Sequence, residues 1–148
     1  MPTRVQRRQV TNPSQEATVN LLVAAGHVLQ ALEEICARHG ITAEQYNMLR
    51  VLRDSHPGGE PRNKVATHCT HRGADVTRML DRLEREGLVA RARAPEDRRC
   101  SLARITKAGL KLLARIDPEF GAETRRLTKS LSPAELRNLT RLTAALVP

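Results

Sequence analysis

Cationic side chains gather in two short stretches near the middle of the chain, and these are its best candidates for chemistry. The first stretch, residues 74–86, has a polar and mainly cationic face made of Asp75, Thr77, Arg78, Arg82 and Arg85. The second is the turn at residues 94–99, which carries Arg98 and Arg99. A helix can enter the DNA major groove, which is about 12 Å wide, and arginines at a hairpin tip can reach the minor groove beside it. Together the two stretches indicate binding to duplex DNA.

Local signals place these arginines on a helix followed by a β-hairpin. Val76, Leu80 and Leu83 recur at helical spacing, which gives the helix an apolar face opposite the cationic one. Gly87 supplies the left-handed residue that ends a helix. The runs 88–93 and 100–105 are typical of strands, and they flank a turn that contains Pro and Asp. A short helix predicted at residues 61–69 precedes the cationic helix, which makes the pair a helix-turn-helix.

Capping signals predict longer helices on both sides of this motif. Asn12 begins a helix that ends near residue 40 and is longer than a small core needs, so part of it is expected to meet another subunit. Thr42 begins the next helix. After the hairpin, Thr106 begins a helix in which Pro118 predicts a kink or short break, and Ser132 begins the last one.

These elements predict a mainly α fold with a small β-hairpin wing. The expected architecture is a winged helix-turn-helix domain with dimerisation helices at its N- and C-terminal ends. Its parts are a flexible basic tail at residues 1–11, a first dimerisation helix at 12–40, a DNA-binding region at 41–105 and C-terminal dimerisation helices at 106–148.

Composition supports a polyanionic partner. The 148 residues carry a net charge of +9, and 40% of them are hydrophobic, although Tyr46 and Phe120 are the only aromatic ones. No apolar run approaches the roughly 18 residues of a membrane span, and no apolar stretch follows the N-terminal arginines, so neither a membrane nor a secretory segment is expected. The odd number of widely spaced cysteines fits a reducing cytoplasm.

Other chemistry is weakly indicated. Cys36, Cys69 and Cys100 suggest a thiol-based redox sensor; Cys69 is expected in the core and Cys100 at the surface of the hairpin. His68-Cys69-x-His71 resembles a metal cluster, but on a helix and turn its side chains are expected to diverge, so no metal is predicted. No phosphate loop, zinc motif or Ser/His/Asp order is present, so we predict no enzyme activity and no cofactor.

The sequence resembles the MarR family of bacterial transcriptional regulators over nearly its whole length. The resemblance rests on an ordered series of short motifs: Val76-Thr77-Arg78, Asp81-Arg82-Leu83-Glu84, Gly87-Leu88-Val89, Arg91, Asp97-Arg98-Arg99 and Ile105-Thr106-Lys107-Ala108-Gly109. It implies a homodimeric winged helix-turn-helix protein in which the second helix of the motif reads bases and terminal helices of two chains interlock.

The resemblance also implies roles for individual residues. Arg99 is expected to enter the minor groove, Asp97 to hold the turn and pair with a nearby arginine, and Arg98 to contact a phosphate. On the helix, the predicted DNA-binding residues are Arg72, Asp75, Thr77, Arg78 and Arg82. Of these, Arg72, Thr77 and Arg78 are assigned to base edges and Arg82 to phosphates.

The predicted function is a sequence-specific regulator, a ligand-responsive repressor that binds a pseudo-palindromic operator as a homodimer. A small-molecule pocket is expected near His27, Tyr46 and Met48, although these residues could equally fill the core. The alternatives are a low-specificity architectural DNA-binding protein, a redox-sensing regulator, and a cofactor-free enzyme or interaction module whose basic face serves solubility.

Overall fold

The computed structural model describes residues 12–68 and 73–147 of the chain. The predicted mainly α fold with a small wing is confirmed. In chain order the elements are α1 (Pro13–Arg38), α2 (Ala43–Asp54), β1 (Glu60–Pro61), α3 (Arg62–Thr67), α4 (Gly73–Arg85), β2 (Val89–Arg93), β3 (Ser101–Ile105), α5 (Lys107–Leu127) and α6 (Pro133–Ala144). The expected basic tail at residues 1–11 lies outside the described residues.

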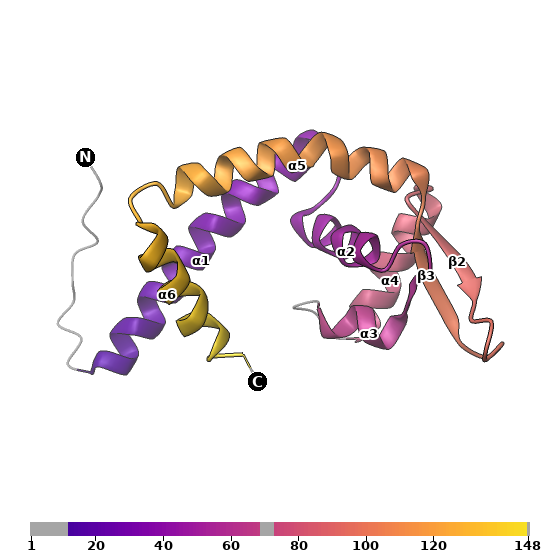
Figure 1. Cartoon of the computed structure of the whole chain (residues 1–148), viewed down its shortest axis with the longest axis horizontal. Helices are drawn as coiled ribbons and strands as arrows, with labels where there is room; N and C mark the ends of the chain where they lie inside the picture. The colour runs from indigo at the N-terminus through magenta and orange to yellow at the C-terminus, as the bar shows by residue number, and fades with distance from the viewer. Residues whose placement is uncertain (1–11, 69–72, 148) are drawn as a thin grey trace.

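The elements form two ends joined by α5. Figure 1 shows α2, α3, α4 and the β2–β3 hairpin together at one end, which we call the reading lobe. The other end, which we call the distal end, holds residues 13–30 of α1 together with α6. Helix α5 runs along the top of both, and α1 packs against α5 and α2. A change in the angle between α5 and α2 therefore changes how the two ends lie relative to each other.

The predicted helix starts are present as capping interactions. The Thr42 hydroxyl accepts from the backbone N–H of Gln45, and the Gln45 side chain accepts from the backbone N–H of Thr42. Ser132 and Glu135 form the same reciprocal box at α6. The Thr106 hydroxyl caps α5 by accepting from the backbone N–H of Gly109. A good cap contributes about 1 kcal/mol, so these starts are fixed by local sequence.

The sheet contains one strand more than the sequence predicted. Strand β3 lies in the centre and pairs antiparallel with β2 on one side and with the two-residue β1 on the other. Pro61 was expected to begin the short helix. It lies instead in β1, where it pairs with Leu102 of β3. It then stands as the N-cap residue of α3, a position that needs no backbone N–H. Each wing strand is also one residue shorter than predicted at its N-terminal end, since the strands begin at Val89 and Ser101.

The junction between α4 and β2 depends on two glycines. Gly87 has φ +73°, as predicted, and the backbone N–H groups of Gly87 and Leu88 donate to the carbonyls of Glu84 and Leu83. These two bonds close the end of the helix in a Schellman motif. Gly109 has no room for a side chain, because an added Cβ would lie 2.6 Å from the Leu88 carbonyl oxygen. The first turn of α5 is thereby docked onto the end of α4.

An aliphatic core holds the reading lobe together. It receives side chains from the last turns of α1, from α2, α3, α4 and the wing, and from the first half of α5. The largest fully buried members are Met48, Leu49, Leu52, Leu80, Leu83, Leu113 and Ile116. Each such side chain contributes roughly 1.5–3 kcal/mol of burial free energy. Val76, Leu80 and Leu83 of α4 have no accessible surface, so the opposite face of α4 is directed to solvent.

The long helices differ from expectation at two points. Helix α5 does not break at Pro118 but continues through it to Leu127. Packing of Leu113, Ile116 and Phe120 on the core outweighs the lost hydrogen bond. Helix α1 is long and apolar enough, by length and composition, to cross a membrane, contrary to the expectation that no such segment exists. The core helix of a soluble protein and a signal sequence meet the same criterion, so it is weak evidence for a membrane span.

Candidate nucleic-acid interface

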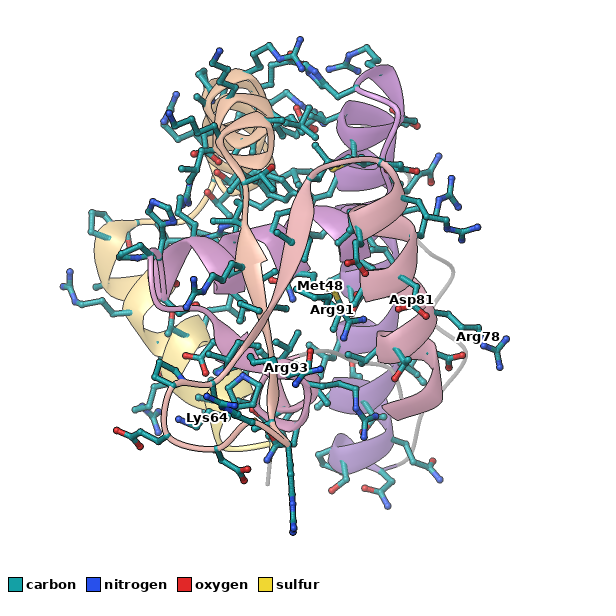
Figure 2. The ribbon with its side chains drawn as sticks, turned by 90° about the vertical axis from the view of Figure 1, so that its right-hand side faces the viewer. Met48, Lys64, Arg78, Asp81, Arg91 and Arg93 are labelled. Carbon is teal, nitrogen blue, oxygen red and sulfur yellow. The ribbon has the colours of Figure 1, made fainter. Side chains whose placement is uncertain are left out.

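The outer face of α4 presents a row of polar side chains to solvent. Asp75, Arg78, Arg82 and Arg85 are exposed, and Thr77 is half-buried. Figure 2 shows Arg78 extending outward from α4, away from the body of the molecule. Arg78 and Arg85 make no ion pair with any described residue, so their charge is available to a ligand. Arg72, also predicted to bind DNA, lies outside the described residues.

Two of the predicted contact residues are held by neighbours. The Thr77 hydroxyl accepts a hydrogen bond from Arg62 Nη1 at 3.3 Å, which ties α4 to α3 across the helix-turn-helix. Arg82 Nε pairs with Glu86 Oε1 at 3.1 Å, one helical turn further along α4. An exposed pair of this kind is worth only about 0.3–0.5 kcal/mol. Arg82 can therefore exchange Glu86 for a phosphate at little cost.

The tip of the hairpin is shaped by Asp97. Its Oδ1 accepts from the backbone N–H of Arg99 at 2.9 Å, and its carbonyl accepts from the N–H of Cys100 at 3.0 Å. Asp97 thus holds the turn, but within residues 12–68 and 73–147 it makes no ion pair with an arginine. Arg98 and Arg99 are exposed on the turn. The backbone is fixed by Asp97 while both guanidinium groups stay free to reach a groove.

Arg91 joins the wing to the reading helix. Its Nη2 pairs with Asp81 Oδ1 at 2.8 Å and its Nε lies 3.5 Å from Glu84 Oε2, so one arginine of β2 meets two carboxylates of α4. Figure 2 shows Arg91 and Asp81 facing each other between hairpin and helix. The Arg91 side chain is only 25% exposed. Because its charge is already neutralised, Arg91 positions the wing instead of contacting a ligand.

Arg93 and Lys64 extend the cationic surface beyond the predicted residues. Both are exposed and make no ion pair with any residue that the structure describes. Figure 2 places Arg93 on the hairpin and Lys64 on α3, on the side of the lobe that faces the viewer. A shallow hollow of about 470 Å³ on the wing is lined by Arg91, Arg93, Arg98, Arg99, Cys100 and Ser101. The wing therefore offers a concave, cationic surface.

The winged-helix geometry and its cationic face agree with comparisons to known proteins. The family model described as "MarR family" matches residues 41–101. The HTH-type transcriptional regulator MhqR of Bacillus subtilis (strain 168) is 30% identical over 105 residues, which cover 71% of this chain and 71% of that protein. The chain belongs to the MarR family. It is a transcriptional regulator and not an enzyme.

The chain is also similar to a repressor and to a solved protein–DNA complex. The homoprotocatechuate degradative operon repressor of Escherichia coli is 28% identical over 125 residues, covering 84% of this chain and 83% of that protein. A crystal structure of a MarR variant from E. coli in complex with operator DNA superposes with a TM-score of 0.83 at 24% identity, covering 95% of this chain and all of that one. That last likeness shows the fold.

The three residues predicted to line a ligand pocket lie in different surroundings. His27 is exposed on α1. Tyr46 is buried, and its hydroxyl donates to Asp117 Oδ1 at 2.6 Å. Met48 has no accessible surface and belongs to the core, so it lines no open pocket in the single chain. The alternative of core filling holds for Met48, and Tyr46 belongs to a polar cluster with α5.

The cysteines differ in surroundings as well. Cys36 has no accessible surface, and burial, with the nearby charge of Glu33, raises the pKa of its thiol to about 11. Such a thiol stays protonated at neutral pH and is a poor nucleophile. Cys100 is half-buried in the hollow of the wing. Cys69 and His71 lie outside the described residues, so the suggested cluster with His68 is not described.

Sequence reasoning missed Arg91, Arg93 and Lys64 as interface residues. Arg91 was recognised only as part of a motif, although Asp81 and Glu84, one turn apart on the preceding helix, indicate a cationic partner. Arg93 follows Arg91 at the two-residue spacing of a strand, which places both on one face of β2. Lys64 gave no signal beyond its charge.

Proposed function

We propose that the protein is a homodimeric transcriptional repressor that acts in the cytoplasm and binds a pseudo-palindromic DNA operator. The observation that carries this proposal is the pairing of two cationic elements on one lobe: the outer face of α4, with Arg78, and the tip of the wing, with Arg99. A helix reading a major groove beside a wing arginine in the minor groove is a geometry that suits duplex DNA.

Roles for individual residues rest on the sequence assignments and, for the described residues, also on exposure and partners. Arg72, Thr77 and Arg78 are proposed to read base edges, and Arg82, Arg98, Arg93 and Lys64 to contact phosphates. Arg99 is proposed to enter the minor groove, where a narrow groove concentrates negative potential. Asp75, at the exposed start of α4, is proposed to accept from a base amino group or to order a neighbouring arginine.

The distal end supports the dimer. Three α1 residues, Val19, Leu22 and Val28, are exposed in the single chain, Leu22 by 67%. At 100° per residue they point to different sides of the helix, so one flat contact cannot cover them. Leu139 and Leu142 on α6, and Leu146 just after it, form a second exposed apolar surface. A second copy that interlocks its own α1 and α6 with these helices would bury both surfaces.

Operator binding is tested by fluorescence anisotropy. The full-length protein is titrated onto the duplex upstream of its own gene and onto a shuffled duplex of equal length, at two salt concentrations. We expect a preference of about 10³-fold or more for the upstream duplex. Similar affinities with a steep salt dependence would favour the architectural alternative. Absence of binding at both salts would remove the proposal, and light scattering should give twice the 16.5 kDa chain mass.

We also propose that a small-molecule effector controls operator binding. The support is the resemblance of the sequence to a family whose members respond to amphipathic ligands. Tyr46 is the residue through which such a ligand would act, because its hydroxyl links the reading lobe to α5. The same anisotropy assay, repeated with small aromatic acids, tests this. A ligand that dissociates the specific complex but not the random one supports it, and unchanged binding across the series contradicts it.

A further inference from the structure

Two carboxylates in the middle of α5, those of Asp117 and Glu119, bind side chains of two different elements. Asp117 binds α2: its Oδ1 accepts from the Tyr46 hydroxyl at 2.6 Å, and its Oδ2 pairs with Arg53 Nη1 at 2.5 Å. Glu119 binds the end of α1: it pairs with Arg38 Nη2 at 2.6 Å and with His39 Nε2 at 2.8 Å. All four carboxylate oxygens are thus engaged, and α2 and α1 meet α5 at one place.

Aromatic packing strengthens the Asp117 contact. Tyr46 and Phe120 are the only aromatic residues of the chain, and their ring centroids lie 5.0 Å apart at this point. The guanidinium of Arg50 lies over both rings, 5.7 Å from the Tyr46 centroid and 5.5 Å from that of Phe120. Rigid rings and a directional cation contact fix the angle between α2 and α5 more closely than aliphatic packing does.

The polar contacts at this place add little to folding stability. Arg53 and Asp117 are each about one-third exposed, and solvent screening leaves such a pair with a small net contribution to stability. The aliphatic core already holds α2 against α5 through Leu49, Leu52 and Leu113. Hydrogen bonds with fixed directions, in contrast, select one arrangement among several with similar packing. Their main effect is therefore on orientation.

We propose that Tyr46, Arg53 and Asp117 are positioning residues for operator recognition, which fix the angle of the reading lobe on α5. In the dimer this angle sets the distance between the two reading helices. It therefore sets how many base pairs may separate the two half-sites. The inference rests on the proposed function, because it concerns the spacing that a homodimer accepts.

The test uses three duplexes: the specific operator and derivatives with one base pair inserted or deleted at its centre. For the wild type we expect the original spacing to be preferred by about tenfold or more, because each base pair shifts and rotates a half-site. In Asp117→Asn and Tyr46→Phe that preference should fall to about twofold, with the affinity for the original duplex reduced far less. Arg53→Lys, which keeps the charge, should retain more of the preference than Arg53→Gln.

A matched control is available on the same helix. Glu123→Gln removes the same kind of charge from α5, but among the described residues Glu123 makes its ion pair and its side-chain hydrogen bonds with Arg126 of the same helix. This variant should keep the wild-type spacing preference. Thermal unfolding of every variant shows whether it is folded at the assay temperature.

The outcomes separate this inference from the function on which it rests. A wild type that binds these three duplexes no better than the shuffled duplex would overturn the proposed function and this inference with it. A wild type that prefers all three equally over the shuffled duplex would overturn this inference alone. A wild type with a clear spacing preference that Asp117→Asn and Tyr46→Phe retain would overturn this inference alone. A loss of affinity in equal proportion at all three spacings would do the same, because it would show a merely structural role.

Discussion

The reading lobe and the distal end expose opposite kinds of surface. The lobe has a buried aliphatic core and presents arginines outward, among them Arg78 and Arg99. The distal end has almost no core of its own and presents leucines and valines, such as Leu22 and Leu146. The lobe can fold as it stands, whereas the distal end leaves apolar surface that water opposes. Each surface is therefore suited to a different partner, a polyanion in one case and a second copy of the chain in the other.

The largest effect is expected from a charge placed on the apolar surface of the distal end. Leu142→Glu should prevent dimer formation, because Leu142 is exposed in the single chain and the substitution need not unfold it. Loss of the second reading lobe should weaken operator binding by about 10²-fold or more. Light scattering and anisotropy measure the two effects. Thr140→Glu, on the opposite side of α6, is the control, and a fully dimeric Leu142→Glu protein would show that this face is not the interface.

Removal of the Arg78 side chain tests whether the reading lobe contacts base edges or phosphates. Arg78→Ala should cost about 1–3 kcal/mol on the specific duplex if the guanidinium contacts a base edge. On the shuffled duplex the loss should be clearly smaller. Arg115→Ala removes an exposed arginine of α5 and should leave specificity unchanged. Equal losses on both duplexes would assign Arg78 to a phosphate instead.

Arg91 and Arg93, two residues apart on β2, should behave differently although they are the same residue type. Arg91→Gln should reduce specificity by a factor of about five, because a wing released from Asp81 no longer directs Arg99. Combined with Arg99→Ala it should then cost little more than Arg99→Ala alone. Arg93→Gln should weaken specific and random binding alike and lower the salt slope by about one. Additive effects of Arg91→Gln and Arg99→Ala would contradict the positioning role.

The smallest expected effect is a change in the pH dependence of the melting temperature when Asp117 is replaced. Partial burial tends to raise the pKa of Asp117, but hydrogen bonds from Tyr46 and Arg53 and the charge of Arg53 outweigh it, and the pKa is lowered. A carboxyl with a lowered pKa in the folded state stabilises the fold above its unfolded pKa, and this contribution is lost as pH falls toward the folded value. Asp117→Asn should therefore lose less Tm than the wild type between pH 5 and pH 3, roughly the range over which an aspartate titrates. Parallel Tm curves for the two proteins would contradict this.

Features fixed by neighbouring residues could be predicted from the sequence. The caps at Thr42, Thr106 and Ser132 depend on side chains within three residues. The helix end at Gly87 needs one residue that tolerates positive φ. The apolar face of α4 follows from a 3.6-residue period. These local rules were sufficient to predict the order of the helices and of the two wing strands, and the place of the cationic face.

Features that depend on distant partners could not be predicted. The pairing of Pro61 with Leu102 joins residues 41 positions apart, and a two-residue strand has no pattern of its own. The continuity of α5 through Pro118 results from packing on other helices, which a local rule cannot anticipate. The neutralised charge of Arg91 likewise follows from the crossing of β2 over α4. Met48 was placed near a pocket by the family resemblance, with core filling as the alternative; its full burial depends on neighbours from several elements, which no local pattern gives.

The position of Asp117 along α5 determines how far a rotation of this helix moves its ends. Its 21 residues span about 31 Å at 1.5 Å per residue, and Asp117 stands ten residues from Lys107 and ten from Leu127. Asp117 therefore lies at the centre of α5, with about 15 Å of helix on each side. The end of α4 packs against one of these halves at Gly109. Moving the end of that half by 3.4 Å, the rise of one base pair, requires a rotation of only about 13°. A small tilt at Asp117 is thus enough to displace a reading helix by one full step along the DNA.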